Sequence, residues 1–256
     1  MQGQHADPPA RTRRTRRPGG HPVRLRDHHQ PPARLSSGGP VRQQVAPVRR
    51  SSRAERGAPP VSLPDAHAGP GRRADWAPVA TTAGVFQLVP VEPERDLATI
   101  SRWMNDPAVA AFWELAGDAG VTAAHLAPQL VADSHSTPWI GVLSGTPMSY
   151  WELYRADLDP LARHYPARPH DMGVHLLIGE GQHRGRGTGT TLLRAVSDLV
   201  LDHVPLCTRV VAEPDISNIP SVSAFLSAGF RFSAEIELPE KRAALMIRDR
   251  AHRTRP

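Results

Sequence analysis

The sequence predicts an α/β sandwich, a domain in which helices pack on a β-sheet. Two observations carry this prediction. A strand, a glycine-rich loop and a helix follow one another from Asp171 to about Val200, and the apolar period changes along them from that of a strand to that of a helix. Shorter strands flank this unit, as a hairpin before it and as an antiparallel pair after it.

A basic segment precedes the domain. Residues 1–80 contain 15 arginines against five acidic residues, although the net charge of all 256 residues is only +6. The same segment holds 13 of the 27 prolines and no run with helical or strand periodicity. Because it cannot bury enough apolar surface to offset the entropy of ordering, we expect residues 1–82 to form a disordered Arg/Pro-rich extension.

Three interpretations of this extension stay open. A nucleic-acid-binding arm would use the dense arginines of residues 11–17, but no aromatic residue that could stack on bases precedes Trp76. A targeting signal would need an apolar stretch after the arginines, and none follows them. We favour translation from a misassigned start, because one lysine against 30 arginines is typical of a GC-rich genome. Nucleic acid is therefore not an expected partner.

Residues 83–250 have the apolar patterns of one folded domain, and residues 251–256 form a tail. Asn105-Asp106-Pro107 ends one helix and begins another, because proline suits the first turn of a helix. Thr122 is the expected N-cap of a third helix. The elements expected in this half are a strand at 85–89, helices at 96–103, 107–117 and 122–133, and a hairpin of strands at 138–143 and 147–154.

The second half of the domain is organised around the central strand. Val174, Leu176 and Ile178 alternate along it, and the glycine-rich loop then leads into a long amphipathic helix. Gly229 is expected to close a later helix as its C′ residue. The elements expected here are a strand at 171–178, a helix from 188 to about 200, a buried strand at 208–214, a helix from 219, and antiparallel strands at 232–238 and 243–248.

The loop from Arg184 to Gly189 has the chemistry of an anion site. It gathers free backbone N–H groups at a helix N-terminus, and Arg184 and Arg186 add positive charge. A Lys-Ser/Thr pair after the last glycine is absent, as is G-x-G-x-x-G, which argues against a P-loop or a dinucleotide loop. The pattern that fits is R-x-x-G-x-G, read at Arg184, Gly187 and Gly189.

This loop and the helix N-x-x-S-x-x-x-F-x-x-x-G-F resemble those of the GNAT superfamily of N-acetyltransferases. Within it, the chain is similar to the siderophore-biosynthesis N-acyltransferases that acylate lysine for mycobactin or N6-hydroxylysine for aerobactin. The resemblance covers residues 84–250 and implies a mixed, mostly antiparallel central sheet flanked by helices. The segments that carry it are 103–114, 150–154, 171–177 and 213–218.

The resemblance implies an acyltransferase that moves an acyl group from acyl-CoA to the side-chain amine or N-hydroxyamine of a lysine-like substrate. The nucleophile must lose a proton, and we expect His175 to accept it as the base. Asp215 is expected either to orient His175 or to hold the cationic end of the substrate. Trp113, Glu114 and Glu152 are the expected substrate site, where a carboxylate would pair with an ammonium group.

Acyl-CoA, with an acetyl or a longer chain, is the expected co-substrate. Many members of the superfamily have a tyrosine, thought to protonate the leaving thiolate, where this chain has Phe225. Water or protonated His175 would then serve as the acid, or the thiolate leaves unassisted. The expected cofactor-binding residues are Leu177, Arg184, Gly185, Arg186, Gly187, Thr188, Gly189, Asn218, Ser221 and Phe225.

Several features of the sequence limit the expected compartment, metal content and membrane association of the protein. Cys207 is the only cysteine, which excludes an internal disulfide and fits a reducing, cytoplasmic compartment. The histidines lack the spacing of metal ligands, so we expect no metal. No apolar run approaches 18 residues, so we expect no membrane span. We expect a monomer or a homodimer.

Two other functions stay open. Aminoglycoside 6′-N-acetyltransferases share the W-x-N and D-P pattern of residues 103–107, and an acidic cleft would suit their polycationic substrates, but His175 argues against this assignment. A non-catalytic GNAT-fold binding module with a nucleic-acid-binding basic tail is the second. The sequence also leaves open the acyl chain length and the choice among lysine, hydroxylysine, ornithine and a diamine.

Overall fold

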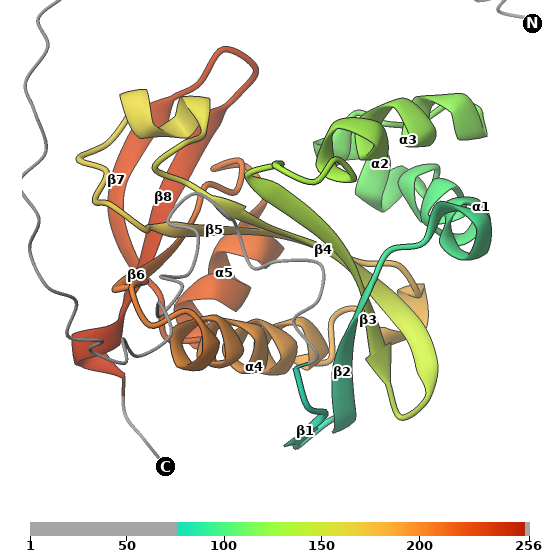
Figure 1. Cartoon of the computed structure of the whole chain (residues 1–256), viewed down its shortest axis with the longest axis horizontal. Helices are drawn as coiled ribbons and strands as arrows, with labels where there is room; N and C mark the ends of the chain where they lie inside the picture. The colour runs from blue at the N-terminus through green and yellow to red at the C-terminus, as the bar shows by residue number, and fades with distance from the viewer. Residues whose placement is uncertain (1–75, 254–256) are drawn as a thin grey trace, which may run out of the picture. The chain divides into compact units, whose positions relative to one another are not determined.

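The computed structural model describes residues 76–253 (Figure 1). The disorder expected for the N-terminal extension concerns residues that, up to position 75, lie outside this range. The three interpretations of the extension therefore stay hypotheses.

An eight-stranded sheet runs through the domain in the order β1-β2-β3-β4-β5-β6-β8-β7. Neighbouring strands are antiparallel except β5 and β6, which are parallel. The predicted fold class, a mixed and mostly antiparallel sheet flanked by helices, is confirmed. The strands are β1 (Val79–Thr81), β2 (Gly84–Pro90), β3 (Ser136–Leu143), β4 (Thr146–Arg155), β5 (Met172–Ile178), β6 (Arg209–Ala212), β7 (Arg231–Glu237) and β8 (Arg242–Asp249).

Helices cover both faces of the sheet (Figure 1). Tyr150 and Trp151 are neighbours in β4 and point to opposite faces, as strand geometry requires. Tyr150 belongs to the core under α1–α3, and Trp151 belongs to the core under α4 and α5. The helices are α1 (Pro93–Met104), α2 (Pro107–Trp113), α3 (Ala119–Leu126), α4 (Thr188–His203) and α5 (Ile219–Ser227), with short 3-10 turns at Ala127–Gln129, Pro160–Arg163, Gly181–His183 and Arg250–His252.

The sheet begins before the expected domain boundary. Strand β1 pairs with β2, so the boundary expected at residue 83 falls inside a hairpin. Trp76 precedes this hairpin and is only 5% exposed, with its ring stacked on Trp139 at a centroid distance of 5.6 Å. A three-residue strand next to a Pro/Arg-rich segment carries no periodicity, which is why the sequence pattern missed it.

Two expected helix ends are wrong. Helix α3 is capped by Asp118, whose carboxylate accepts a hydrogen bond from the Gly120 N–H group, and the expected N-cap Thr122 is buried inside the helix. Helix α2 ends at Trp113 and not near Gly117, because Glu114 adopts a left-handed conformation with a φ of 54°. The first difference makes α3 begin earlier than expected, and the second shortens α2.

The parallel strands β5 and β6 pair over only two residues. Met172 lies opposite Val210, and Gly173 lies opposite Val211. Asp171 is fully buried and fixes this end, because it accepts two hydrogen bonds from the Arg209 guanidinium, one of them from Nε at 2.9 Å. Within the described chain no ladder pair joins the two strands beyond this point, so they diverge toward their C-terminal ends.

Candidate active site

A pocket of about 380 Å³ lies where β5 and β6 diverge. Residues 174–176 of β5 and residues 212–215 at the end of β6 form two of its walls. Helix α2, helix α5 and the connection between β7 and β8 close it, with Trp113, Asn218 and Lys241 among their contributions. The pocket therefore brings together segments that the sequence separates by more than a hundred residues.

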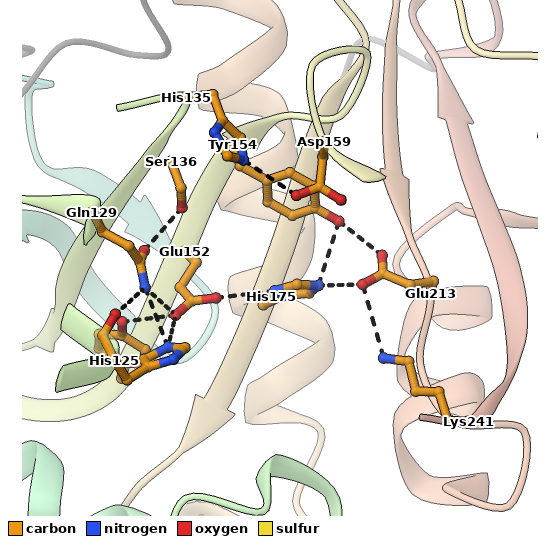
Figure 2. A network of polar contacts seen from close by, with 11 residues as sticks. His125, Gln129, His135, Ser136, Glu152, Tyr154, Asp159, His175, Glu213 and Lys241 are labelled. Carbon is orange, nitrogen blue, oxygen red and sulfur yellow. Dashed lines mark hydrogen bonds and ion pairs between the residues drawn. The ribbon is translucent and has the colours of Figure 1, made fainter. Parts of the chain in front are cut away.

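His175 is held between two buried glutamates (Figure 2). Its Nδ1 atom lies 3.0 Å from Glu152 Oε2 on β4, and its Nε2 atom contacts Glu213 Oε1 at the end of β6. Glu152 is the cross-strand partner of His175, which places both side chains on one face of the sheet. Both ring nitrogens must carry protons if both contacts are hydrogen bonds, because a carboxylate only accepts.

The protonation states follow from this geometry. Burial lowers the pKa of His175, but the charge of Glu213 and the hydrogen bonds to both glutamates outweigh it and raise the pKa to about 10. Burial likewise raises the pKa of Glu213, but the charge of His175 outweighs it and brings the pKa to about 2. At neutral pH the ring is therefore an imidazolium. It has no lone pair to accept a proton, so the resting geometry does not support the expected role of His175 as the base.

Glu152 is saturated by donors from the protein. Its Oε1 atom accepts hydrogen bonds from His125 Nε2 at 2.5 Å, Gln129 Nε2 at 2.8 Å and the Tyr150 hydroxyl at 2.9 Å. Burial raises the pKa of Glu152, but the hydrogen bonds from His125 and His175 outweigh it and hold the pKa well below its usual range. The carboxylate lines the pocket, yet it has little capacity left for the substrate ammonium that it was expected to bind. It fixes His175 instead.

Tyr154 completes the surroundings of His175. Its ring centroid lies 4.8 Å from that of the imidazole, and its hydroxyl donates a hydrogen bond of 2.8 Å to Glu213 Oε2. The tyrosine ring packs directly over Gly173, where a Cβ atom would come within 2.0 Å of it. The glycine of the D-M-G-V-H-L segment is thus explained by the close approach of Tyr154.

Asp215 lines the pocket but its carboxylate is bonded to Ser217. It accepts hydrogen bonds from the Ser217 backbone N–H group at 2.7 Å and from its hydroxyl at 2.5 Å, and these bonds lower the pKa of Asp215. Of the two roles expected for Asp215, the orientation of His175 falls to Glu152 and Glu213. The binding of a cationic substrate group stays a proposal.

The glycine-rich loop has the geometry of an anion site. Gly185 and Gly187 have φ values of 69° and 79°, a left-handed conformation that glycine adopts without strain. Gly187 is the N-cap of α4, and no side chain caps this helix. The N–H groups of the first turn, at Thr188 and Gly189, therefore stay open to an anion.

The two arginines of the loop differ. Arg184 donates from Nε to the Ile178 carbonyl at 2.7 Å and from Nη2 to the Gly179 carbonyl at 2.9 Å, and its Nη1 atom lies 3.1 Å from Asp106 Oδ2. These bonds fasten the loop to the end of β5 and to the start of α2. Arg186 is exposed, and among residues 76–253 no ion pair or hydrogen bond engages its side chain. Arg186 is therefore the arginine that is free to meet an anion.

The expected substrate residues Trp113 and Glu114 lie at the end of α2. The Trp113 ring meets that of His175 edge-on, at a centroid distance of 6.2 Å, and also contacts the rings of His125 and Tyr150. Glu114 is exposed, and both residues line the pocket. This placement supports a substrate-side role for both, which stays a proposal.

The expected cofactor residues outside the loop fall into two groups. Asn218, Ser221 and Phe225 line the pocket from α5, where Asn218 Oδ1 caps the helix by accepting from the Ser221 N–H group at 3.2 Å. The Leu177 side chain is instead buried against the core under α1–α3 and is not among the pocket residues.

Sequence reasoning missed three residues of the site, Tyr154, Glu213 and Lys241. Glu213 belongs to the same E-P-D-I-S-N segment as Asp215, and a four-residue strand has no alternation that would show which carboxylate points toward His175. Tyr154 shares the face of Glu152 at a spacing of two residues, a signal that was available in Y-W-E-L-Y. Lys241, the only lysine of the chain, is brought to the pocket by the return of β7 into β8.

Comparison with known families identifies the domain. Residues 92–238 match the acetyltransferase (GNAT) domain. The chain belongs to this family. The match runs from the start of α1 to the end of β7 and includes Glu152, His175 and Glu213, but not Lys241. Membership of the GNAT superfamily, predicted from the sequence, is confirmed. The acyltransferase activity of this chain stays a proposal.

Two curated relatives carry related names. The chain is 38% identical over 161 residues to the N(6)-hydroxylysine O-acetyltransferase of Escherichia coli, an alignment that covers 63% of this chain and 51% of the relative. It is 34% identical over 168 residues to the lysine N-acyltransferase MbtK of Mycobacterium sp. (strain MCS), covering 66% of this chain and 68% of the relative. The chain thus spans about half the length of the first relative and about two thirds of the second.

Solved structures share the fold. The crystal structure of an uncharacterized protein from Bacillus halodurans is 32% identical with a TM-score of 0.64, over 68% of this chain and 90% of that one. The aminoglycoside acetyltransferase AAC(6′)-Ib, in complex with coenzyme A and kanamycin, is 25% identical with a TM-score of 0.55, over 65% of this chain and 95% of that one. The fold therefore holds coenzyme A in a protein similar to this chain.

Three further observations concern residues 76–253. No helix in this range is long and apolar enough to cross a membrane. The His, Cys, Asp and Glu side chains in this range form no group of three or more that is placed to hold a metal ion. Burial raises the pKa of the Cys207 thiol to about 11, so this residue is not a nucleophile at neutral pH.

Proposed function

We propose that this chain is an acyl-CoA-dependent N-acyltransferase that acylates the side-chain amine or N-hydroxyamine of a lysine-like substrate in siderophore biosynthesis, in the cytoplasm. One observation carries the proposal. A cationic histidine, His175, is fixed between two buried carboxylates in a pocket at the point where two parallel strands diverge. The names of the two curated relatives, which refer to N6-hydroxylysine and to lysine, support the substrate class.

The gap between the diverging ends of β5 and β6 offers groups that could bind acyl-CoA. Beyond Gly173 and Val211 the facing edges of β5 and β6 share no ladder hydrogen bonds, so main-chain donors and acceptors face the opening. The amides of a pantetheine arm would pair with such groups as an added strand does. The pyrophosphate would bind the uncapped first turn of α4, where Arg186 adds positive charge. An acetyl group or a longer acyl chain is compatible with this arrangement.

The proposed reaction is direct attack of the substrate nitrogen on the thioester carbonyl. The new N–C bond forms, the C–S bond breaks, and one proton must travel from nitrogen to sulfur. Glu213 accepts the proton from the nitrogen, and the His175 imidazolium donates its own to the departing thiolate. A proton exchange along the contact between Glu213 and His175 then restores the resting site. His175 thus supplies the acid that Phe225 cannot provide.

An N-hydroxyamine suits this site better than an alkylamine. Glu213, with a pKa of about 2, is a weak base. A lysine side chain has a pKa of about 10.4 and is therefore almost fully protonated at neutral pH, whereas a hydroxylamine is less basic and is already neutral. An N-hydroxyamine therefore needs a weaker base than an alkylamine does, and Glu213 is a weak base.

The test is thiol release by the full chain with acetyl-, succinyl- and long-chain acyl-CoA, each crossed with N6-hydroxylysine, lysine, N-hydroxycadaverine and kanamycin. We expect turnover with the hydroxylamines, and its loss in His175→Ala. Turnover confined to kanamycin would contradict the proposal and assign the aminoglycoside function. If no thiol is released, and removal of residues 1–75 abolishes salt-sensitive DNA binding, the chain is a binding module instead.

A further inference from the structure

Lys241 is a cation in the pocket whose hydrogen-bonding capacity is unused. It lies in the connection between β7 and β8, lines the pocket, and has a side chain that is only 24% exposed. Figure 2 shows its ammonium group pointing toward Glu213, and the distance from Nζ to Glu213 Oε1 is 3.9 Å, too long for a hydrogen bond. Within residues 76–253 Nζ donates no hydrogen bond, although an ammonium group has three donors.

The neighbouring carboxylates are already engaged. Glu152 and Glu213 accept hydrogen bonds from buried donors, and Asp215 accepts two from Ser217. A largely buried ammonium group with unused donors is costly unless a ligand supplies acceptors. The side chain of Lys241 is therefore placed to receive an anionic group of a molecule that enters the pocket.

The charged groups beside Lys241 indicate which charges that molecule should carry. Glu240 precedes it in the same connection, is exposed, and lines the pocket together with Asp215. Both hydrogen bonds from Ser217 go to Asp215 Oδ1, so within residues 76–253 Asp215 Oδ2 and the Glu240 carboxylate accept none. The Lys241 ammonium group next to these oxygens is complementary to a zwitterion. An α-amino acid carries a carboxylate and an ammonium group on one carbon, whereas a diamine or an aminoglycoside has no carboxylate for Lys241.

We propose that Lys241 binds the α-carboxylate of the acyl acceptor and thereby selects an α-amino acid over a diamine of the same length. The inference rests on the proposed function, because it concerns the acceptor side of the same pocket. It assigns N6-hydroxylysine as the acceptor in preference to N-hydroxycadaverine, which differs only in lacking the carboxylate.

The experiment compares these two acceptors in the full chain and in Lys241→Met. Arg242→Met is the matched control, because it removes the same charge from the next residue, whose guanidinium pairs outside the pocket with Glu235 and Glu237. We expect Lys241→Met to raise KM for N6-hydroxylysine about 10- to 100-fold, as the loss of a charge-assisted hydrogen bond does. KM for N-hydroxycadaverine stays unchanged, Lys241→Arg recovers most of the loss, and Arg242→Met affects neither acceptor.

Two kinetic outcomes overturn the inference. An equal effect of Lys241→Met on both acceptors means that Lys241 acts through Glu213, and no effect on either means that it binds neither.

Calorimetric binding of L-lysine and cadaverine separates this inference from the proposed function. Binding of lysine that depends on Lys241, without thiol release from any acceptor, supports the inference and refutes the function. Equal binding of both ligands by the unsubstituted chain refutes the inference even if turnover is observed. Thermal melts of the variants exclude unfolding as the cause.

Discussion

The imidazole of His175 contacts the carboxylate of Glu213 across the opening between β5 and β6. At that level the two strands share no ladder hydrogen bonds, so this contact joins them where the backbone does not. It also fixes the charge of the ring, because Glu213 is the largest of the influences that raise the pKa of His175.

Replacement of Glu213 by glutamine removes the proposed proton acceptor and lowers the pKa of His175 from about 10. We expect kcat to fall at least ~100-fold, the smallest contribution typical of general acid–base catalysis. We also expect the alkaline limb of the pH–kcat profile to move to lower pH, because the imidazolium is lost earlier. Nuclear magnetic resonance titration of the His175 ring measures the pKa directly. Glu237→Gln, at an exposed position of β7, is the control, and an alkaline limb that does not move would contradict the assignment.

The same cluster predicts how stability depends on pH. The pKa of His175 is higher in the folded chain, about 10, than its ordinary value of 6.5, so its contribution is complete below pH 6.5 and is lost as the pH rises toward 10. The pKa of Glu213 is lower, about 2 against 4.5, so its contribution is complete above pH 4.5 and is lost as the pH falls toward 2. The cluster therefore stabilises the fold most between pH 4.5 and 6.5.

Urea unfolding at pH 6 and pH 9 measures the alkaline half of this effect. The unsubstituted chain should lose more free energy of unfolding between the two values than His175→Gln does. His135→Gln provides the matched histidine control, because the only side-chain partner of His135 among the described residues is Asp159, outside the pocket. If the unsubstituted chain and His175→Gln lose the same free energy of unfolding, the contacts of His175 with the two glutamates do not stabilise the folded chain as described.

The folded domain begins at Trp76, before the first segment in which the sequence shows a periodic pattern. Its ring is buried against Trp139, so Trp76→Ala should lower the free energy of unfolding by roughly 3–5 kcal/mol, the usual cost of emptying a buried aromatic site. A chain that starts at residue 76 should keep the stability of the full chain, whereas one that starts at residue 84 should not. Leu206→Ala, at a side chain that is 56% exposed, is the control for denaturation. Equal stability of the two truncated chains would contradict the packing role of Trp76.

Arg184 and Arg186 should separate stability from coenzyme binding. Arg184→Met removes bonds to two main-chain carbonyls and to Asp106, so we expect a lower melting temperature. Arg186→Met removes an exposed charge without a partner in the described chain, so we expect a higher KM for acyl-CoA, most marked at low salt, and an unchanged melting temperature. If Arg186→Met leaves KM for acyl-CoA unchanged at every salt concentration, the phosphate site lies elsewhere.

Most of the fold could be predicted because its signals are local. Gly229, with a φ of 95°, ends α5 as expected, and Ser144 and Gly145, with φ values of 49° and 83°, form the expected hairpin turn. Prediction failed where a segment has no pattern of its own. Strand β1 is only three residues long, and the burial of Trp76 depends on Trp139 and His203, which lie far along the chain.

The residues of the site likewise fall into those that could be predicted from the sequence and those that could not. The resemblance to the acyltransferase family, and not the residue types alone, indicated His175, Trp113 and Asn218, which all line the pocket. The partners of His175 were not predictable, since they depend on the register between β4 and β5 and on the direction in which the chain leaves β6. These are properties of the assembled sheet, and no periodicity within either strand encodes them.

Separate elements of the chain contribute the residues that line the pocket. Asn218, Ser221 and Phe225 come from α5, whereas Trp113 and Lys241 come from α2 and from the connection between β7 and β8. The contacts of His175 with Glu152 and Glu213 are already formed in the chain without a ligand. In the proposed reaction, donor preference and acceptor preference are therefore separable traits.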